Sequence, residues 1–143
     1  EYNADYAAHC RIETAPYPGV AALLRTLHTQ GRKLAIVSNK PDEAVRALRA
    51  DFFADAVQIA VGETAAIRRK PAPDMLLAAM EQLGADPDKT VFVGDSEVDI
   101  ATARAADLPC ISVLWGFRDR DVLERAGAQQ YAADIAQLQA LLG

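Results

Sequence analysis

The chain has 143 residues, of which 51% are hydrophobic and 24% are charged, and this composition is typical of one soluble globular domain with a substantial core. Its formal net charge is −5 and its isoelectric point is about 5.0, so an acidic surface argues against nucleic-acid and anionic-membrane partners. Two cysteines are too few for a disulfide framework, and we find no signal peptide or long apolar run, which predicts a cytoplasmic protein.

Apolar residues at two different spacings predict alternating helices and strands along the chain. The first segment, Glu1–Thr14, is expected to be a helix, and Pro16, Pro18 and Gly19 then interrupt the chain. The later elements are expected to be a helix from Val20 that ends before Gly31, strand Lys33–Val37, a helix from Pro41 to Leu48, strand Ala56–Val61, a helix capped by Asp74 and ended by Gly84, strand Thr90–Val93, helix Asp99–Ala106, strand Cys110–Leu114, helix Asp119–Arg125, a weak strand near Tyr131, and helix Asp134–Leu142.

The expected strands are apolar throughout, which is typical of parallel sheets that are buried on both faces. The sequence therefore predicts an α/β fold with a doubly wound, Rossmann-like parallel sheet. Because crossovers in such sheets are right-handed, the polar residues that follow the strands should meet at one edge.

Two carboxylates follow the strand in the segment VFVGDSEVD. Asp95 comes directly after the strand, and Asp99 lies four residues later, one turn into the next helix. Paired oxygen ligands of this kind suit a hard cation such as Mg²⁺. The simpler alternative is that Asp95 belongs to a turn and that Asp99 caps the helix.

Three other polar residues are expected at the same edge. Ser38 and Asn39 follow one strand, and Lys70 lies in the loop after the next strand. A hydroxyl, backbone N–H groups and a lysine can bind a phosphate, and a Mg²⁺ ion beside them would neutralise phosphoryl charge. Taken singly, Ser38-Asn39 also fits an ordinary turn, and Lys70 fits a solvated loop. Together they indicate a phosphoryl-transfer pocket.

The sequence resembles a known family in four segments, which occur in the same order as in that family. A fifth segment matches more weakly. The segments are PYPGV at 16–20, AIVSNKP at 35–41, RKPAPDMLL at 69–77, VGDSEVDI at 93–100 and, more weakly, WGFR at 115–118. The sequence resembles the haloacid dehalogenase superfamily, in particular its phosphoglycolate-phosphatase-like members. The resemblance covers nearly all of residues 16–143.

The resemblance implies a role for each candidate site residue. Ser38 would donate a hydrogen bond to a phosphoryl oxygen, with help from the backbone at Asn39. Lys70 would balance negative charge on the phosphoryl group, and Asp95 would bind Mg²⁺. Asp99 would orient Lys70 or a metal-bound water, or serve as a further ligand.

The family pattern also has an Asp-x-Asp motif on the first strand, which supplies the nucleophile and the general acid/base. This sequence has no such motif, and Asn3-Ala4-Asp5 is a poor substitute. We therefore expect residues 1–15 to be a remnant of a helical cap domain and residues 16–143 to be the core, with the first strand missing. A central gap in the sheet would then favour self-association, or cleavage from a longer protein after folding.

We therefore expect the protein to be a Mg²⁺-dependent phosphomonoester phosphatase. Its expected substrate is a small phosphorylated metabolite such as 2-phosphoglycolate. A pyrophosphatase or a sugar-phosphate phosphatase of the same superfamily is an open alternative. The chain by itself is expected to be inactive without the nucleophile. The alternative class is a non-catalytic phosphate-binding or interaction module. A phosphoacceptor receiver domain is disfavoured, because there the acidic pair precedes the lysine.

Overall fold

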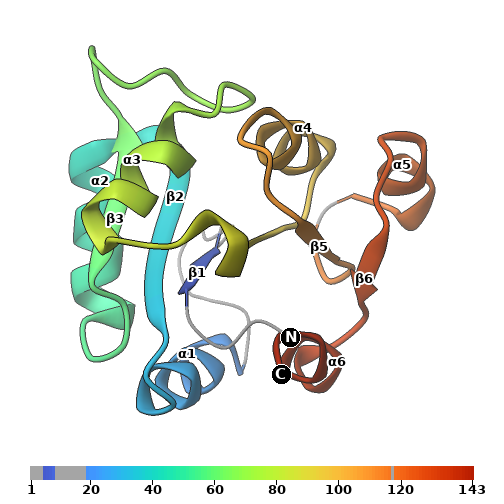
Figure 1. Cartoon of the computed structure of the whole chain (residues 1–143), viewed down its shortest axis with the longest axis horizontal. Coiled ribbons are helices and arrows are strands. Elements are labelled where there is room, and N and C mark those ends of the chain that lie inside the picture. The colour runs from blue at the N-terminus through green and yellow to red at the C-terminus, as the bar shows by residue number, and fades with distance from the viewer. Residues whose placement is uncertain (1–4, 9–18, 117) are drawn as a thin grey trace.

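A six-stranded sheet forms the centre of the computed structural model, which describes residues 5–8, 19–116 and 118–143 (Figure 1). The strands are β1 (Asp5–Ala8), β2 (Lys33–Pro41), β3 (Ile59–Glu63), β4 (Thr90–Gly94), β5 (Cys110–Val113) and β6 (Gln130–Ala132). The helices are α1 (Val20–Thr29), α2 (Asp42–Leu48), α3 (Asp74–Leu83), α4 (Glu97–Ala105), α5 (Arg120–Arg125) and α6 (Ile135–Leu142), with a π-helical turn η1 (Arg49–Phe53) and a 3₁₀ turn η2 (Pro87–Lys89). Neighbouring strands all run parallel in the order β3-β2-β1-β4-β5-β6, so the predicted doubly wound α/β fold is confirmed.

Two buried clusters lie on opposite faces of the sheet. On one face α1, α2 and α6 contribute Leu27, Val45 and Leu142, and α1 lies beside α6 (Figure 1). On the other face α3 and α4 contribute Met75 and Ala103. Both faces of residues 34–37 in β2 and 91–93 in β4 are therefore buried, which explains why these runs are apolar. Within the described part of the chain, no helix has the length and apolar character needed to cross a bilayer.

The N-terminal segment corrects one expectation. Its described residues, Asp5–Ala8, form strand β1 between β2 and β4, so the helix expected over Glu1–Thr14 is wrong there, and the rest of that segment lies outside the described residues. The expected central gap is occupied by β1, which removes the physical reason for a second chain at this position. The residues that follow this strand are His9, Cys10 and Arg11, so no Asp-x-Asp motif stands at its end. The assignment of residues 1–15 to a cap domain stays a prediction.

Several element boundaries differ from those predicted. Strand β2 extends beyond Val37 to Pro41, because after a register shift Pro41 pairs with Glu63 of β3. Strand β3 starts at Ile59 rather than Ala56, although Ala56 is buried. An apolar run marks burial, whereas a strand also requires ladder hydrogen bonds, so the two do not share the same ends.

Candidate active site

Ser38 and Asp95 lie at the same level of the carboxyl edge of the sheet. Ala8 of β1 pairs with Ile36 of β2 and with Val93 of β4, and Ser38 and Asp95 each come two residues later. Both are nearly buried. Two strand spacings separate them, roughly 10 Å. The crevice between β1 and β4, where the strand order reverses, lies at this edge, and in doubly wound sheets this is where ligands bind.

Lys70 and Asp99 form a buried ion pair at this edge. The Nζ of Lys70 donates to Oδ1 of Asp99 at 2.5 Å, and the side chains are 3% and 0% exposed. The ammonium also lies 5.8 Å from the centroid of the Phe92 ring, within reach of a cation–π interaction. An ammonium has three N–H donors, and the hydrogen bond to Asp99 engages one of them and fixes the place of the charge.

The second oxygen of Asp99 holds the start of α4. Oδ2 accepts the backbone N–H groups of Asp95 and Ser96 at 3.0 and 3.2 Å, and also the Ser96 hydroxyl. Ser96, not Asp99, is the N-cap, and the two side chains form a capping box. A Cβ at Gly94 would overlap Asp99, so a glycine is required there. Both oxygens of Asp99 are thus engaged in hydrogen bonds, which argues against direct metal ligation.

Asn39 fixes the backbone of Lys70. Its Oδ1 accepts the Lys70 N–H at 2.7 Å, and its Nδ2 donates to the Lys70 carbonyl at 3.3 Å. This amide therefore joins the end of β2 to the loop that carries the lysine. The structure brings Asn39, Lys70 and Asp99 into one connected set, whereas the proposed help of the Asn39 backbone in phosphate binding stays a prediction.

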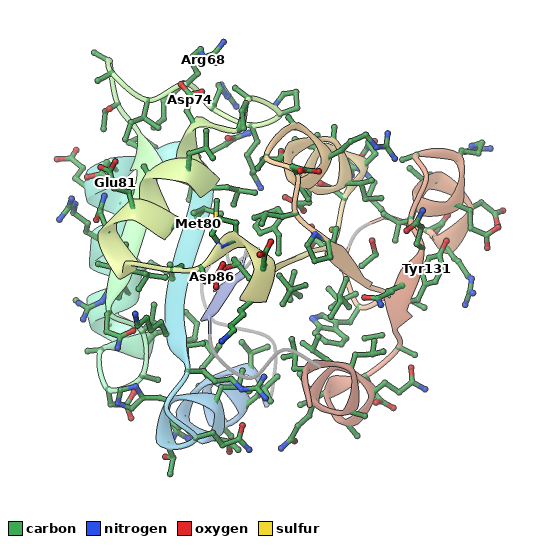
Figure 2. All side chains as sticks on the ribbon, in the orientation of Figure 1. Arg68, Asp74, Met80, Glu81, Asp86 and Tyr131 are labelled. Carbon is green, nitrogen blue, oxygen red and sulfur yellow. The ribbon has the colours of Figure 1, made fainter. Side chains whose placement is uncertain are left out.

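The loop between β3 and α3 is anchored beside this set. Figure 2 shows Arg68 and Asp74 next to each other at the top of the molecule, where Arg68 donates through Nε and Nη2 to Asp74 at 3.0 and 2.8 Å. These hydrogen bonds hold the pKa of Asp74 below its ordinary value. The loop lies at the same end of the molecule as the start of α4 (Figure 1). Because Arg68 precedes Lys70 in the loop and Asp74 follows it, their hydrogen bonds hold together the two ends of the segment that carries the lysine.

The Ser38 hydroxyl is suited to donate to an anion. Its Oγ accepts the N–H of Lys40 at 3.3 Å, and this contact does not use the hydroxyl proton. The residue is 7% exposed. Ser38 and Lys70 thus supply a neutral donor and a cation at the same edge, which is what a phosphoryl group requires.

Ligation of Mg²⁺ by Asp95 stays a prediction. A Cβ at Gly116 would overlap its Oδ2, so the loop after β5 runs directly against it. No cluster of three or more His, Cys, Asp or Glu side chains able to hold a metal exists within residues 5–8, 19–116 and 118–143. Mg²⁺ commonly uses one or two carboxylates together with substrate phosphate and water, so Asp95 alone fits a site that a bound phosphate completes.

An ion pair that the sequence did not reveal lies beside Asp95. Arg118, on the loop after β5, donates through Nε to Glu97 of α4 at 2.7 Å. The hydrogen bond from Arg118 lowers the pKa of Glu97. The two residues are 21 positions apart, and no local spacing indicates such a contact. Asp99 was predicted as the cap of α4, whereas the spacing Ser-x-x-Asp at 96–99 is the signal that would have indicated Ser96.

Comparisons with known proteins show the family to which this fold belongs. The family profile described as haloacid dehalogenase-like hydrolase matches residues 1–107. A phosphoglycolate phosphatase of Rhodospirillum rubrum is 36% identical over 143 residues, which are 99% of this chain and 59% of that protein. Another from Cereibacter sphaeroides is 39% identical over 118 residues, covering 82% of this chain and 53% of that protein.

Solved structures give the same fold. A protein from Lactobacillus delbrueckii subsp. bulgaricus, described as a phosphoglycolate phosphatase, has a TM-score of 0.88 and 44% identity, with 93% of this chain and 56% of that chain covered. A hydrolase from Pseudomonas syringae has a TM-score of 0.74 and 32% identity, with 89% and 61% covered. The chain spans little more than half the length of these relatives. It belongs to the haloacid dehalogenase-like hydrolase family.

Proposed function

We propose that this chain forms the phosphate- and Mg²⁺-binding part of a phosphomonoester phosphatase. The observation that carries the proposal is the buried Lys70–Asp99 ion pair, set at the carboxyl edge with Ser38 and Asp95. A lysine that is held in place before the substrate arrives stabilises phosphoryl charge without a reorganisation cost.

Each residue has one task in this proposal. Ser38 donates to a phosphoryl oxygen, Lys70 neutralises the phosphoryl group, and Asn39 and Asp99 hold Lys70 in position. Asp95 would bind Mg²⁺, and a bound Mg²⁺ would supply further positive charge against the phosphoryl oxygens. No Asp-x-Asp motif follows strand β1, so we expect the chain alone to bind phosphate esters without hydrolysing them.

The proposed substrate is a small phosphorylated metabolite of the phosphoglycolate type. The names of the relatives from R. rubrum and C. sphaeroides support this choice. The acidic net charge of −5 supports the expectation that nucleic acid is not a partner.

Thermal unfolding with Mg²⁺ and inorganic phosphate tests the binding site. At about 100 times the dissociation constant, a ligand adds about 2.7 kcal/mol, or about 5–10 °C in a domain of this size. Asp95→Asn should abolish the Mg²⁺-dependent part of the rise. An equal rise in wild type and Asp95→Asn would refute the assignment of Asp95 as the metal ligand.

A non-catalytic phosphate-binding module is the second candidate, and the lack of Asp-x-Asp after β1 favours it. Release of phosphate from 2-phosphoglycolate by the product of the whole gene distinguishes the two. Release indicates the phosphatase, and binding without release indicates the module.

A further inference from the structure

The ion pair between Arg118 and Glu97 is exposed, and it joins two elements that border the candidate site. Arg118 is on the loop after β5, Glu97 is the first residue of α4, and their side chains are 45% and 41% exposed. Exposed pairs of this kind contribute little to folding stability. The ion pair is therefore too weak a contribution to the free energy of unfolding to explain why an arginine occupies position 118.

Two observations put Arg118 close to the site. The backbone of Gly116, two residues earlier, lies against the carboxylate of Asp95. The pKa of Arg118 is raised above its ordinary value by the hydrogen bond to Glu97 and, further, by the charges of Asp95 and Asp99. The guanidinium is thus within electrostatic reach of both carboxylates at the edge of the sheet.

The chemistry of Arg118 differs from that of Lys70. Lys70 is buried and paired, so it suits the phosphoryl group at the base of the pocket. Arg118 is about half exposed and presents five N–H donors in a planar fork, of which the Nε donor is held by Glu97. A planar fork matches a carboxylate through two parallel hydrogen bonds.

We propose that Arg118 is a specificity-determining residue that binds the carboxylate of a phosphorylated carboxylic acid, and that Glu97 positions it. The inference rests on the proposed function, because it assumes that Ser38 and Lys70 bind the phosphoryl end of the same molecule. The substrate class is then a phosphate monoester with a carboxylate a few bonds from the phosphate.

Calorimetric binding to the 143-residue chain in Mg²⁺ tests the proposal with three probes: 2-phosphoglycolate, ethyl phosphate, which lacks the carboxylate, and inorganic phosphate. In wild type, 2-phosphoglycolate should bind about tenfold more tightly than ethyl phosphate. Arg118→Gln should remove this preference and leave the affinity for inorganic phosphate unchanged. Arg118→Lys, which keeps the charge but loses the fork, should retain only part of the preference.

Arg120→Gln is the matched control. Arg120 also pairs with an exposed glutamate, Glu124 at 3.0 Å, and its removal changes the net charge equally. Its loss should leave the preference intact. If Arg118→Gln weakens all three probes alike, or if Arg120→Gln has the same effect, the specificity role is refuted while the phosphate site stands. If wild type binds none of the probes, the proposed function fails and the specificity role fails with it.

Discussion

The Lys70–Asp99 ion pair should be among the costliest contacts to break in this protein. Both side chains are buried, so removal of one partner leaves the other without this counter-charge in a poorly solvated place. Breaking such a pair from one side costs about 3–5 kcal/mol, which is a fall of about 6–20 °C in the melting temperature of a domain of this size. We therefore expect Asp99→Asn and Lys70→Met each to be strongly destabilising.

A double-mutant cycle separates this pair from the other contacts of Asp99. Because Asp99 also accepts the backbone N–H groups of Asp95 and Ser96 just before α4, the double variant should be less stable than wild type. Its loss of stability should still be smaller than the sum of the two single losses. Urea unfolding followed by circular dichroism should give a coupling free energy of about 1.5–3 kcal/mol. The same cycle on Arg120 and Glu124, an exposed pair, should give under about 1 kcal/mol. Additive losses at Lys70 and Asp99 would refute the reasoning.

Three further predictions concern the surroundings of the site. Gly116→Ala should displace Asp95 and remove most of the Mg²⁺-dependent rise in melting temperature, and an unchanged rise would show that the contact is unimportant. Glu97, whose pKa is lowered by Arg118, adds stability above its unfolded pKa that is lost as the pH falls through its folded pKa, so Arg118→Gln should raise the pKa of Glu97 in an NMR titration. Burial raises the pKa of the Cys110 thiol to about 12, so peptide mapping after thiol labelling at pH 8 should find Cys110 unmodified in the native protein and modified in urea.

The positions of Ser38 and Asp95 could be predicted because of how the sheet is built. Apolar runs mark buried parallel strands, and the carboxyl ends of such strands meet at one edge. The polar residue that follows each run is therefore placed by topology alone, and the structure has Ser38 and Asp95 at the same level. No side-chain geometry enters this part of the reasoning.

The contacts that fix these residues could not be predicted in the same way. Asn39 and Lys70 are 31 positions apart, and Glu97 and Arg118 are 21 apart, so their meeting depends on loop conformations rather than on periodicity. Strand β1 was missed for a different reason. Its sequence, DYAA, contains alanines that favour a helix, and pairing with both β2 and β4 overrides this weak local preference.

Asp99 connects the stability of this fold to the binding chemistry that we propose. One carboxylate oxygen holds Lys70 and the other holds the N-terminal turn of α4, so the loop after β3 and the end of β4 are fixed by the same side chain. If Asp99 instead ligated Mg²⁺, it would give up its hydrogen bond from Lys70 or those from Asp95 and Ser96 in the capping box of α4, each at a cost in free energy. We therefore propose Asp95, rather than Asp99, as the ligand of a cation at this edge. Lys70, held by Asp99, is already in position to bind a phosphate.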